Sequence, residues 1–382
     1  MRLIDTHHGF KAAVDDLEFP LVSDIVLVEQ QGWFEPEVDF IAALAKLTGG
    51  TMIDVGANVG VYALTWCARG GRQAFAVEPN PVLLKRLEAN KAANHAPLEI
   101  FPIALAEVAG RMGFIPSDTA GRLAAPGEGI NIEVQTLDNL FAARDIAMPI
   151  VLKIDVEGAE SRVLAGGNRL VRDRDPLVMA ERSSQAAAAL AALGLDLYRL
   201  LPGLGCLVPE ANDHDMINLF AFGPAWRERL IPSGLLADSA GGPEMPLDLS
   251  NGRDLQSALH AWPSGGRSLS ALSKAYLAGI HLLKQGPSFA DLLAFSRVAM
   301  DFGLRRQAFS AASEALNRAA TLEERVLSLE AVEISRCWSI AFGGTWTRPS
   351  LEEIAKDDAL TPMLAHRLDL MRKLEKLGRL PI

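Results

Sequence analysis

The stretch TMIDVGANVG, residues 51–60, joins a short apolar run to a glycine loop. Residues 51–54 predict a buried strand, and the loop from Asp54 to Gly60 opens a helical stretch. Glycines at such a turn let backbone amides approach a ligand where a side chain would obstruct it. The loop lacks the Lys and Ser/Thr of a phosphate-binding loop, and its glycine spacing differs from the dinucleotide fingerprint. It predicts a nucleotide-type site of another kind, with a purely structural turn as the alternative.

Strands and helices alternate outward from this stretch as far as residue 223. Helical spacing appears at 81–94 and 159–171, and 186–193 is mostly alanine. Residues 112–134 read as a hairpin or an irregular insertion. Strands are expected at 51–54, 74–78, 98–103, 150–155, 177–181, 197–201 and 216–222. This alternation predicts an α/β fold with a largely parallel sheet covered by helices on both faces.

The remainder of the chain has a different character. Prolines and glycines interrupt residues 231–266, which we expect to be a linker, and 267–382 are expected to form an all-α domain. Its helices are expected at 269–284, 289–302, 306–320, 322–340 and 351–377. The hairpin 289–321 resembles a tetratricopeptide unit in its small-residue spacing, and a small helical bundle is the alternative.

Composition bounds the class of protein. The chain has 382 residues, 49% of them apolar and 22% charged, which suits a globular protein with two domains. The net charge is −10; 30 acidic and 20 basic side chains precede residue 237, and 17 of each follow. This balance argues against a nucleic-acid partner. Three distant cysteines disfavour a disulfide framework, and no apolar run approaches the roughly 18 residues of a membrane span, so we expect a cytoplasmic protein.

Glu78 ends the second expected strand, about twenty residues after the glycine loop, where a carboxylate can accept both hydroxyls of a ribose. An NAD site would satisfy the same pair of features. An NAD-dependent oxidoreductase therefore remains open on these residues alone.

Three motifs, which follow one another along the chain, distinguish an NAD site from another kind of nucleotide site. The Asp54-Val55-Gly56-Ala57-Asn58 loop is followed by Thr136-Leu137-Asp138 and then by Lys153-Ile154-Asp155-Val156-Glu157-Gly158-Ala159-Glu160. In this combination the chain resembles the FkbM family of S-adenosylmethionine-dependent methyltransferases. The resemblance extends upstream to Gly32-Trp33-Phe34-Glu35-Pro36 and covers roughly residues 24–223. The region after residue 224 has no counterpart in the family's shared core.

The resemblance implies a class I methyltransferase domain at 49–230, preceded by a lead-in or lid at 1–48. It implies a Rossmann-like sheet of seven strands, the last antiparallel, and S-adenosyl-L-methionine as the cofactor. Asp54 and the loop would shape the methionine end, Glu78 would take the ribose, and Ile103 and Ala104 would lie near the adenine. The residues expected to bind the cofactor are Asp54, Gly56, Ala57, Asn58, Gly60, Glu78, Asn80, Ile103, Ala104 and Asp155.

Methyl transfer to an oxygen needs an acceptor that is placed in line and stripped of its proton. We expect Asp155 and Glu157 to supply this, with Glu181 and Lys153 as secondary candidates. Asp155 and Glu157 could instead hold Mg²⁺, but no third oxygen ligand follows from the spacing, so no metal is expected. Glu157 and Glu160 could also serve the start of the following helix.

The sequence therefore predicts O-methylation of a hydroxyl on a sugar, glycan or other small-molecule acceptor. The alternatives are an NAD-dependent oxidoreductase and a non-catalytic interaction protein that acts through its helical domain. We expect that domain to bind a protein partner, to form homo-oligomers or to cover the acceptor.

Overall fold

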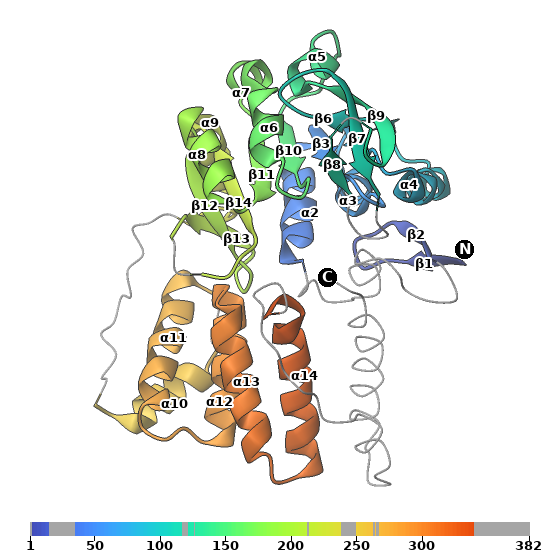
Figure 1. The fold of residues 1–382 in the computed structure, drawn as a ribbon. Coiled ribbons are helices and arrows are strands. Elements are labelled where there is room, and N and C mark those ends of the chain that lie inside the picture. Colours follow the sequence, from blue (N-terminus) through green and yellow to red (C-terminus); the bar gives the residue numbers. More distant parts are fainter. Residues whose placement is uncertain are drawn as a thin grey trace. The chain divides into compact units, whose positions relative to one another are not determined.

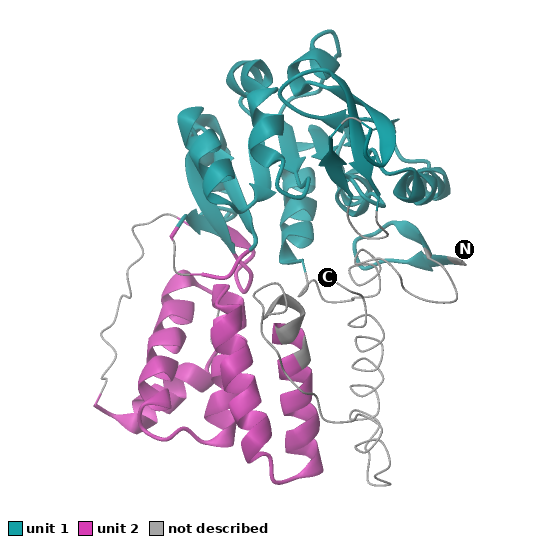
Figure 2. Ribbon diagram, viewed as in Figure 1, with its two compact units in different colours: residues 1–200, 207–210, 217–236 teal, residues 201–206, 211–216, 237–382 magenta. Residues whose placement is uncertain are grey.

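The structure is a computed structural model that describes residues 2–14, 35–116, 121–125, 127–211, 214–237, 250–262, 264 and 267–339 (Figure 1). The chain divides into two compact units (Figure 2). The first contains residues 1–200, 207–210 and 217–236, and the second contains 201–206, 211–216 and 237–382. The second unit thus takes two short segments from the region in which the sequence predicts only the α/β domain.

The main sheet of the described chain has eight strands in the order β13-β12-β14-β11-β10-β3-β4-β5. Strand β14 runs antiparallel to both of its neighbours, whereas β11, β10, β3, β4 and β5 are parallel. The strands are β3 (Thr51–Val55), β4 (Gln73–Val77), β5 (Leu98–Phe101), β10 (Ile150–Ile154), β11 (Leu177–Glu181), β12 (Asp196–Leu201), β13 (Cys206–Pro209) and β14 (Asn218–Phe222). The predicted α/β architecture is confirmed, but the expected seven-stranded sheet is extended by β13, which returns beside β12 after a short turn.

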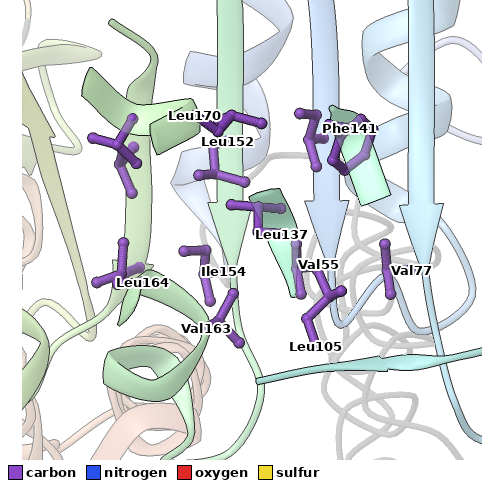
Figure 3. Packing of buried hydrophobic residues seen from close by; sticks show 14 of the residues in the cluster. Val55, Val77, Leu105, Leu137, Phe141, Leu152, Ile154, Val163, Leu164 and Leu170 are labelled. Carbon is purple, nitrogen blue, oxygen red and sulfur yellow. The ribbon is translucent and has the colours of Figure 1, made fainter. Parts of the chain in front are cut away.

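Helices cover both faces of this sheet because the strands are apolar on both sides. On one face, Leu137 and Phe141 lie against strand residues such as Val55 and Val77 (Figure 3). On the other face, Phe40 meets Phe220 edge-to-face with ring centroids 5.2 Å apart. The helices of this unit are α2 (Pro36–Thr48), α3 (Val61–Ala68), α4 (Pro81–Asn94), α5 (Leu137–Phe141), α6 (Glu160–Ala165), α7 (Asn168–Arg174), α8 (Ser184–Ala192) and α9 (Pro224–Leu230).

The described part of the first unit also contains two smaller sheets. The hairpin of β1 (Arg2–Asp5) and β2 (Lys11–Val14) is held to α4, where Asn90 Oδ1 accepts a hydrogen bond from Ala13 N at 2.6 Å. The sequence predicts either a hairpin or an irregular insertion at residues 112–134. The described residues of this region belong to a four-stranded sheet in the order β6-β9-β7-β8. These strands are β6 (Ala104–Leu105), β7 (Gly110–Ile115), β8 (Arg122–Ala124) and β9 (Ile130–Gln135).

Between residues 250 and 339, the described part of the second unit is helical, as predicted. Its helices are α10 (Gly252–His260), α11 (Leu269–Leu283), α12 (Phe289–Phe302), α13 (Arg305–Arg318) and α14 (Leu322–Ser339). Gly303 caps α12 in the left-handed region, and Ala308, Ala312 and Ala315 are fully buried. The predicted pair 289–321 therefore forms as two packed helices, while its tetratricopeptide character stays a prediction. The helix expected at 351–377 lies outside the described residues.

Three expected boundaries are wrong. Part of the expected linker forms α10, because Leu255, Leu259 and the nearby Trp262 are buried in the helical core. The strand expected to reach Ile103 ends at Phe101, just before Pro102, which has no N–H to donate. The helix expected at 159–171 is two helices, broken at Gly166, where a Cβ would lie 2.2 Å from the Ala106 carbonyl oxygen.

Candidate functional site

The glycine loop lies at the carboxyl end of β3, where it turns into α3. Gly56 has a φ of 76°, and a Cβ at this position would lie 1.8 Å from the carbonyl oxygen of Asp155. Only glycine fits so close an approach of two backbones. The amides of Gly56 and Ala57 both donate to the Val77 carbonyl, at 2.9 and 3.1 Å. The expectation that the loop offers its amides to a ligand is therefore wrong for these two residues, because their N–H groups are hydrogen-bonded to the end of β4.

Glu78 follows β4 and is only 5% exposed. Its Oε2 accepts a hydrogen bond from Asn58 N at 2.9 Å, and its Oε1 accepts one from Asn80 N at 2.8 Å. Burial raises the pKa of Glu78 to about 7, against the lowering effect of these two hydrogen bonds and of Lys153. A carboxylate has about four lone-pair sites, so these two bonds leave acceptor capacity at each oxygen.

A pocket of about 690 Å³, partly open to solvent, lies beside Glu78. Its lining comes from the carboxyl ends of β3, β4 and β10, from the segment after β5 and from β7 and β8 of the small sheet. Ligands of open α/β sheets collect at this edge. The lining residues are Val55, Gly56, Asn58, Val77, Glu78, Pro79, Leu83, Ile103, Ala104, Leu105, Phe114, Gly121, Leu123, Asp155, Val156, Glu157 and Ala159.

The structure brings seven of the thirteen predicted site residues into this lining: Gly56, Asn58, Glu78, Ile103, Ala104, Asp155 and Glu157. The other six, Asp54, Ala57, Gly60, Asn80, Lys153 and Glu181, lie outside it. Sequence reasoning missed Phe114 and Leu123, which reach the pocket from β7 and β8. No local motif marks these two residues, because only the packing of the small sheet brings them to the pocket.

Several predicted residues have clear structural partners. Asn80 caps α4, with its Oδ1 accepting from Val82 N at 3.0 Å. In the Thr136-Leu137-Asp138 motif, Thr136 caps α5, and Asp138 accepts hydrogen bonds from Leu170 N at 2.7 Å and Arg169 N at 3.1 Å. This last motif therefore ties α5 to the start of α7.

Lys153 and Asp54 are paired in the parallel register of β10 and β3, so both side chains leave the sheet on the same face. The Lys153 ammonium lies 3.3 Å from Asp54 Oδ1 and 3.3 Å from Asp155 Oδ2. It also donates a hydrogen bond to the Gly56 carbonyl oxygen at 2.8 Å. Asp54 accepts a further bond from Ala63 N in α3 at 3.2 Å. These contacts form a buried polar cluster behind the pocket wall.

Acidic side chains gather where β10 and β11 end. Glu157 has a φ of 54°, in the left-handed region that favours glycine, and its loop is held by Glu160 Oε1, which accepts from Val156 N and Gly158 N at 3.1 Å each. Partial burial and the charges of Asp155 and Glu160 raise the pKa of Glu157. The same causes, with Glu157 added, raise the pKa of Glu181 to about 7. A carboxylate with a pKa near 7, such as Glu181, is suited to accepting a proton near neutral pH.

No group of three or more His, Cys, Asp or Glu side chains in the described ranges is arranged to hold a metal ion. No helix in the described part of the chain is long and apolar enough to cross a membrane.

Comparison with known proteins adds to this geometry. Residues 54–214 match the family model described as "Methyltransferase FkbM domain". The chain is 30% identical over 201 residues to the 31-O-demethyl-FK506 methyltransferase FkbM of Streptomyces tacrolimicus, covering 75% of that protein and 43% of this chain. The chain belongs to the FkbM methyltransferase family. Family membership also confirms S-adenosylmethionine as the expected cofactor.

Two other relatives are matched over shorter shares of their length. The hexuronic acid methyltransferase AglP of Haloferax volcanii is 35% identical over 118 residues, which are 48% of that protein and 30% of this chain. The solved FkbM methyltransferase of Methylobacillus flagellatus is 17% identical with a TM-score of 0.32, over 46% of this chain and 43% of that one. The chain thus spans about half the length of these two relatives.

The pocket fits the cofactor of the FkbM family on two observations. Glu78 is a buried carboxylate with unused acceptor capacity at the pocket wall, as a ribose diol requires. Leu83, Ile103 and Leu105 give the same pocket an apolar side, as a purine requires.

Proposed function

We propose that this chain transfers a methyl group from S-adenosylmethionine to a hydroxyl oxygen of a sugar or another small molecule. The cofactor would lie in the pocket at the carboxyl ends of β3, β4 and β10. The observation that carries this proposal is Glu78, a nearly buried carboxylate held by two backbone amides beside an apolar pocket. Family membership supports methyl transfer over the NAD-dependent alternative and over a purely non-catalytic role.

The roles of individual residues follow from their place in the pocket. Glu78 would accept the ribose hydroxyls, and Leu83, Ile103 and Ala104 would contact the adenine. Gly56 and Asn58 would contact the methionine end, near Asp155. When bound, the cofactor supplies an electrophilic methyl group on a sulfonium.

Asp155 and Glu157 would act on the acceptor. Both line the pocket, and the Asp155 side chain is 46% exposed, so an acceptor hydroxyl can reach it. One of the two carboxylates would take the hydroxyl proton as the new oxygen–carbon bond forms and the sulfur–methyl bond breaks. Glu181, outside the lining, would contribute its charge to this region rather than a direct contact.

The acceptor class rests on the relatives. One is named a hexuronic acid methyltransferase and another a 31-O-demethyl-FK506 methyltransferase, so one name points to a sugar acid and the other to an oxygen as the acceptor. We extend this class to the present chain, and we further propose that residues 267–382 bind a protein partner, mediate self-association or cover the acceptor.

Calorimetric titration of the full chain with S-adenosylmethionine, S-adenosylhomocysteine and NAD tests this function. We expect both S-adenosyl compounds to bind and NAD not to bind. Glu78→Ala should weaken binding by about 1.5–3 kcal/mol, the range for hydrogen bonds to a charged group. Glu88→Ala, at an exposed position of α4, is the matched control and should leave affinity unchanged. Selective NAD binding, or equal affinity in the Glu78 variant, would refute the proposal.

A further inference from the structure

Lys153 joins two parts of the pocket wall without reaching the pocket itself. Its ammonium donates to the Gly56 carbonyl at 2.8 Å and lies 3.3 Å from Asp155 Oδ2. Gly56 and Asp155 both line the pocket, whereas Lys153 does not and has a side chain only 4% exposed. One buried group therefore holds the end of β3 and the end of β10 in a single arrangement.

The surroundings of Lys153 keep it charged and in place. Burial alone would lower its pKa, but Asp54, Asp155 and Glu35 together raise the pKa above its usual value. The ring of the buried Tyr62 lies 5.2 Å from the ammonium, and the Tyr62 hydroxyl is hydrogen-bonded to Glu35. Lys153 is thus confined between carboxylates, a carbonyl oxygen and an aromatic ring.

We propose that Lys153 is a positioning residue that fixes the Asp155 carboxylate against the Gly56 loop, so that both present one fixed geometry to the cofactor. This inference rests on the proposed function, because it takes the pocket to be the cofactor site. The competing account is that Lys153 only neutralises the buried charge of Asp54 and Asp155. The two accounts differ in whether restoring the charge balance restores ligand binding.

The test is a set of calorimetric titrations with S-adenosylmethionine and S-adenosylhomocysteine, below the unfolding midpoint of each variant. The full-length variants are Lys153→Met, Asp155→Asn and the double variant, with Lys85→Met, at an exposed position of α4, as the control. We expect Lys153→Met to weaken both ligands by a similar factor, about 10-fold or more, since hydrogen bonds to a charged group are lost. The control should bind like the wild type.

The ratio of the affinities for the two ligands distinguishes a positioning role of Lys153 from charge neutralisation alone. S-adenosylmethionine carries one more positive charge than S-adenosylhomocysteine, so loss of a nearby cation by itself would favour the sulfonium. A Lys153→Met chain that binds S-adenosylmethionine as well as the wild type does, or better, would overturn the positioning role. Equal weakening of both ligands supports it.

The double variant keeps the proposal testable if Lys153→Met alone does not fold, because it returns the summed formal charge of Asp54, Lys153 and Asp155 to its wild-type value, although Asp54 stays charged. We expect it to bind both ligands as weakly as Lys153→Met, and more weakly than Asp155→Asn. Recovery of the double variant to the affinity of Asp155→Asn would show charge neutralisation alone and overturn the inference. A wild-type chain that binds neither ligand would instead refute the proposed function.

Discussion

Glu78 combines a position at the pocket wall with an unfavourable ionisation. Burial raises its pKa from 4.5 to about 7, so between these values the folded chain keeps a proton that the unfolded chain has released. The free energy of unfolding contributed by this group therefore falls as the pH rises from about 4.5 to 7. Glu35 and Glu181, whose pKa values are also raised to about 7 by burial and neighbouring charges, act in the same direction.

Replacing Glu78 by Gln removes one of these titrations. We expect the melting temperature of Glu78→Gln, relative to the wild type, to be more favourable at pH 8 than at pH 5, whatever its absolute value. Thermal unfolding followed by circular dichroism at both pH values measures this difference. A difference that stays constant, or becomes less favourable at pH 8, would contradict the raised pKa.

Asp155 and Glu157 are expected to act on the acceptor rather than to stabilise the fold. Both line the pocket rather than the core, so their conservative amide variants change little packing. Asp155→Asn and Glu157→Gln should lower turnover by about 10²- to 10⁴-fold if the residue supplies the general base. The melting temperature should stay nearly unchanged. Full activity of both variants on an identified acceptor would rule out the assignment.

At the scale of elements, the small sheet β6-β9-β7-β8 forms part of the pocket lining. Phe114 and Leu123 from its strands line the pocket, and Phe114 also packs with Ala104, Ile132 and Val134 in the core of that sheet. The segment after β5 thus contributes one wall of the site through tertiary packing.

Leu123→Ala tests whether this wall contacts the ligand. Leu123 is only partly buried, so the substitution removes little packing from the core of the small sheet. We expect cofactor affinity to fall by about 1–2 kcal/mol, from the apolar contact removed. Ile130→Ala is the matched control, because Ile130 lies on β9 of the same sheet, is 38% exposed and does not line the pocket. Equal affinities in the two variants, measured by calorimetry, would exclude contact of Leu123 with the ligand.

At the scale of the whole molecule, the two units interleave along the chain. The second unit includes 201–206 and 211–216, where Gly203 N donates to the Asp301 carbonyl at 3.0 Å and Asp215 N donates to the Gly303 carbonyl at 2.9 Å. Arg306 adds an ion pair to Asp215 at 3.1 Å. A cut in the expected linker therefore removes the partners of these two segments.

A chain ending at Gly241 is expected to bind cofactor with near-native affinity, because all pocket-lining residues lie between 55 and 159. Its melting temperature should be lower, since the amides of Gly203 and Asp215 lose their acceptors. Calorimetry and thermal unfolding of the shortened chain measure both effects. An insoluble fragment would favour a helical unit that completes the α/β core. A fragment that kept the oligomeric state and acceptor turnover of the full chain would remove the role proposed for residues 267–382.

Local patterns in the sequence were enough to predict the alternation of strands and helices, the glycine loop, the placement of Glu78 at the end of a strand and the helical character of the second unit. Each depends on neighbours a few residues apart: apolar periodicity, a glycine at a strand end, or a capping residue such as Asn80 before Pro81. The order of motifs also predicted the family, and with it the antiparallel β14.

Only the tertiary structure decided what meets at the site. The register of β10 against β3 pairs Lys153 with Asp54, and a slip of one residue would place the lysine on the other face of the sheet. The packing of the small sheet brings Leu123 to a pocket whose glycine loop lies more than sixty residues earlier in the chain. Contacts between such distant residues depend on strand pairing and close packing of the complete fold, which no local pattern of residues specifies.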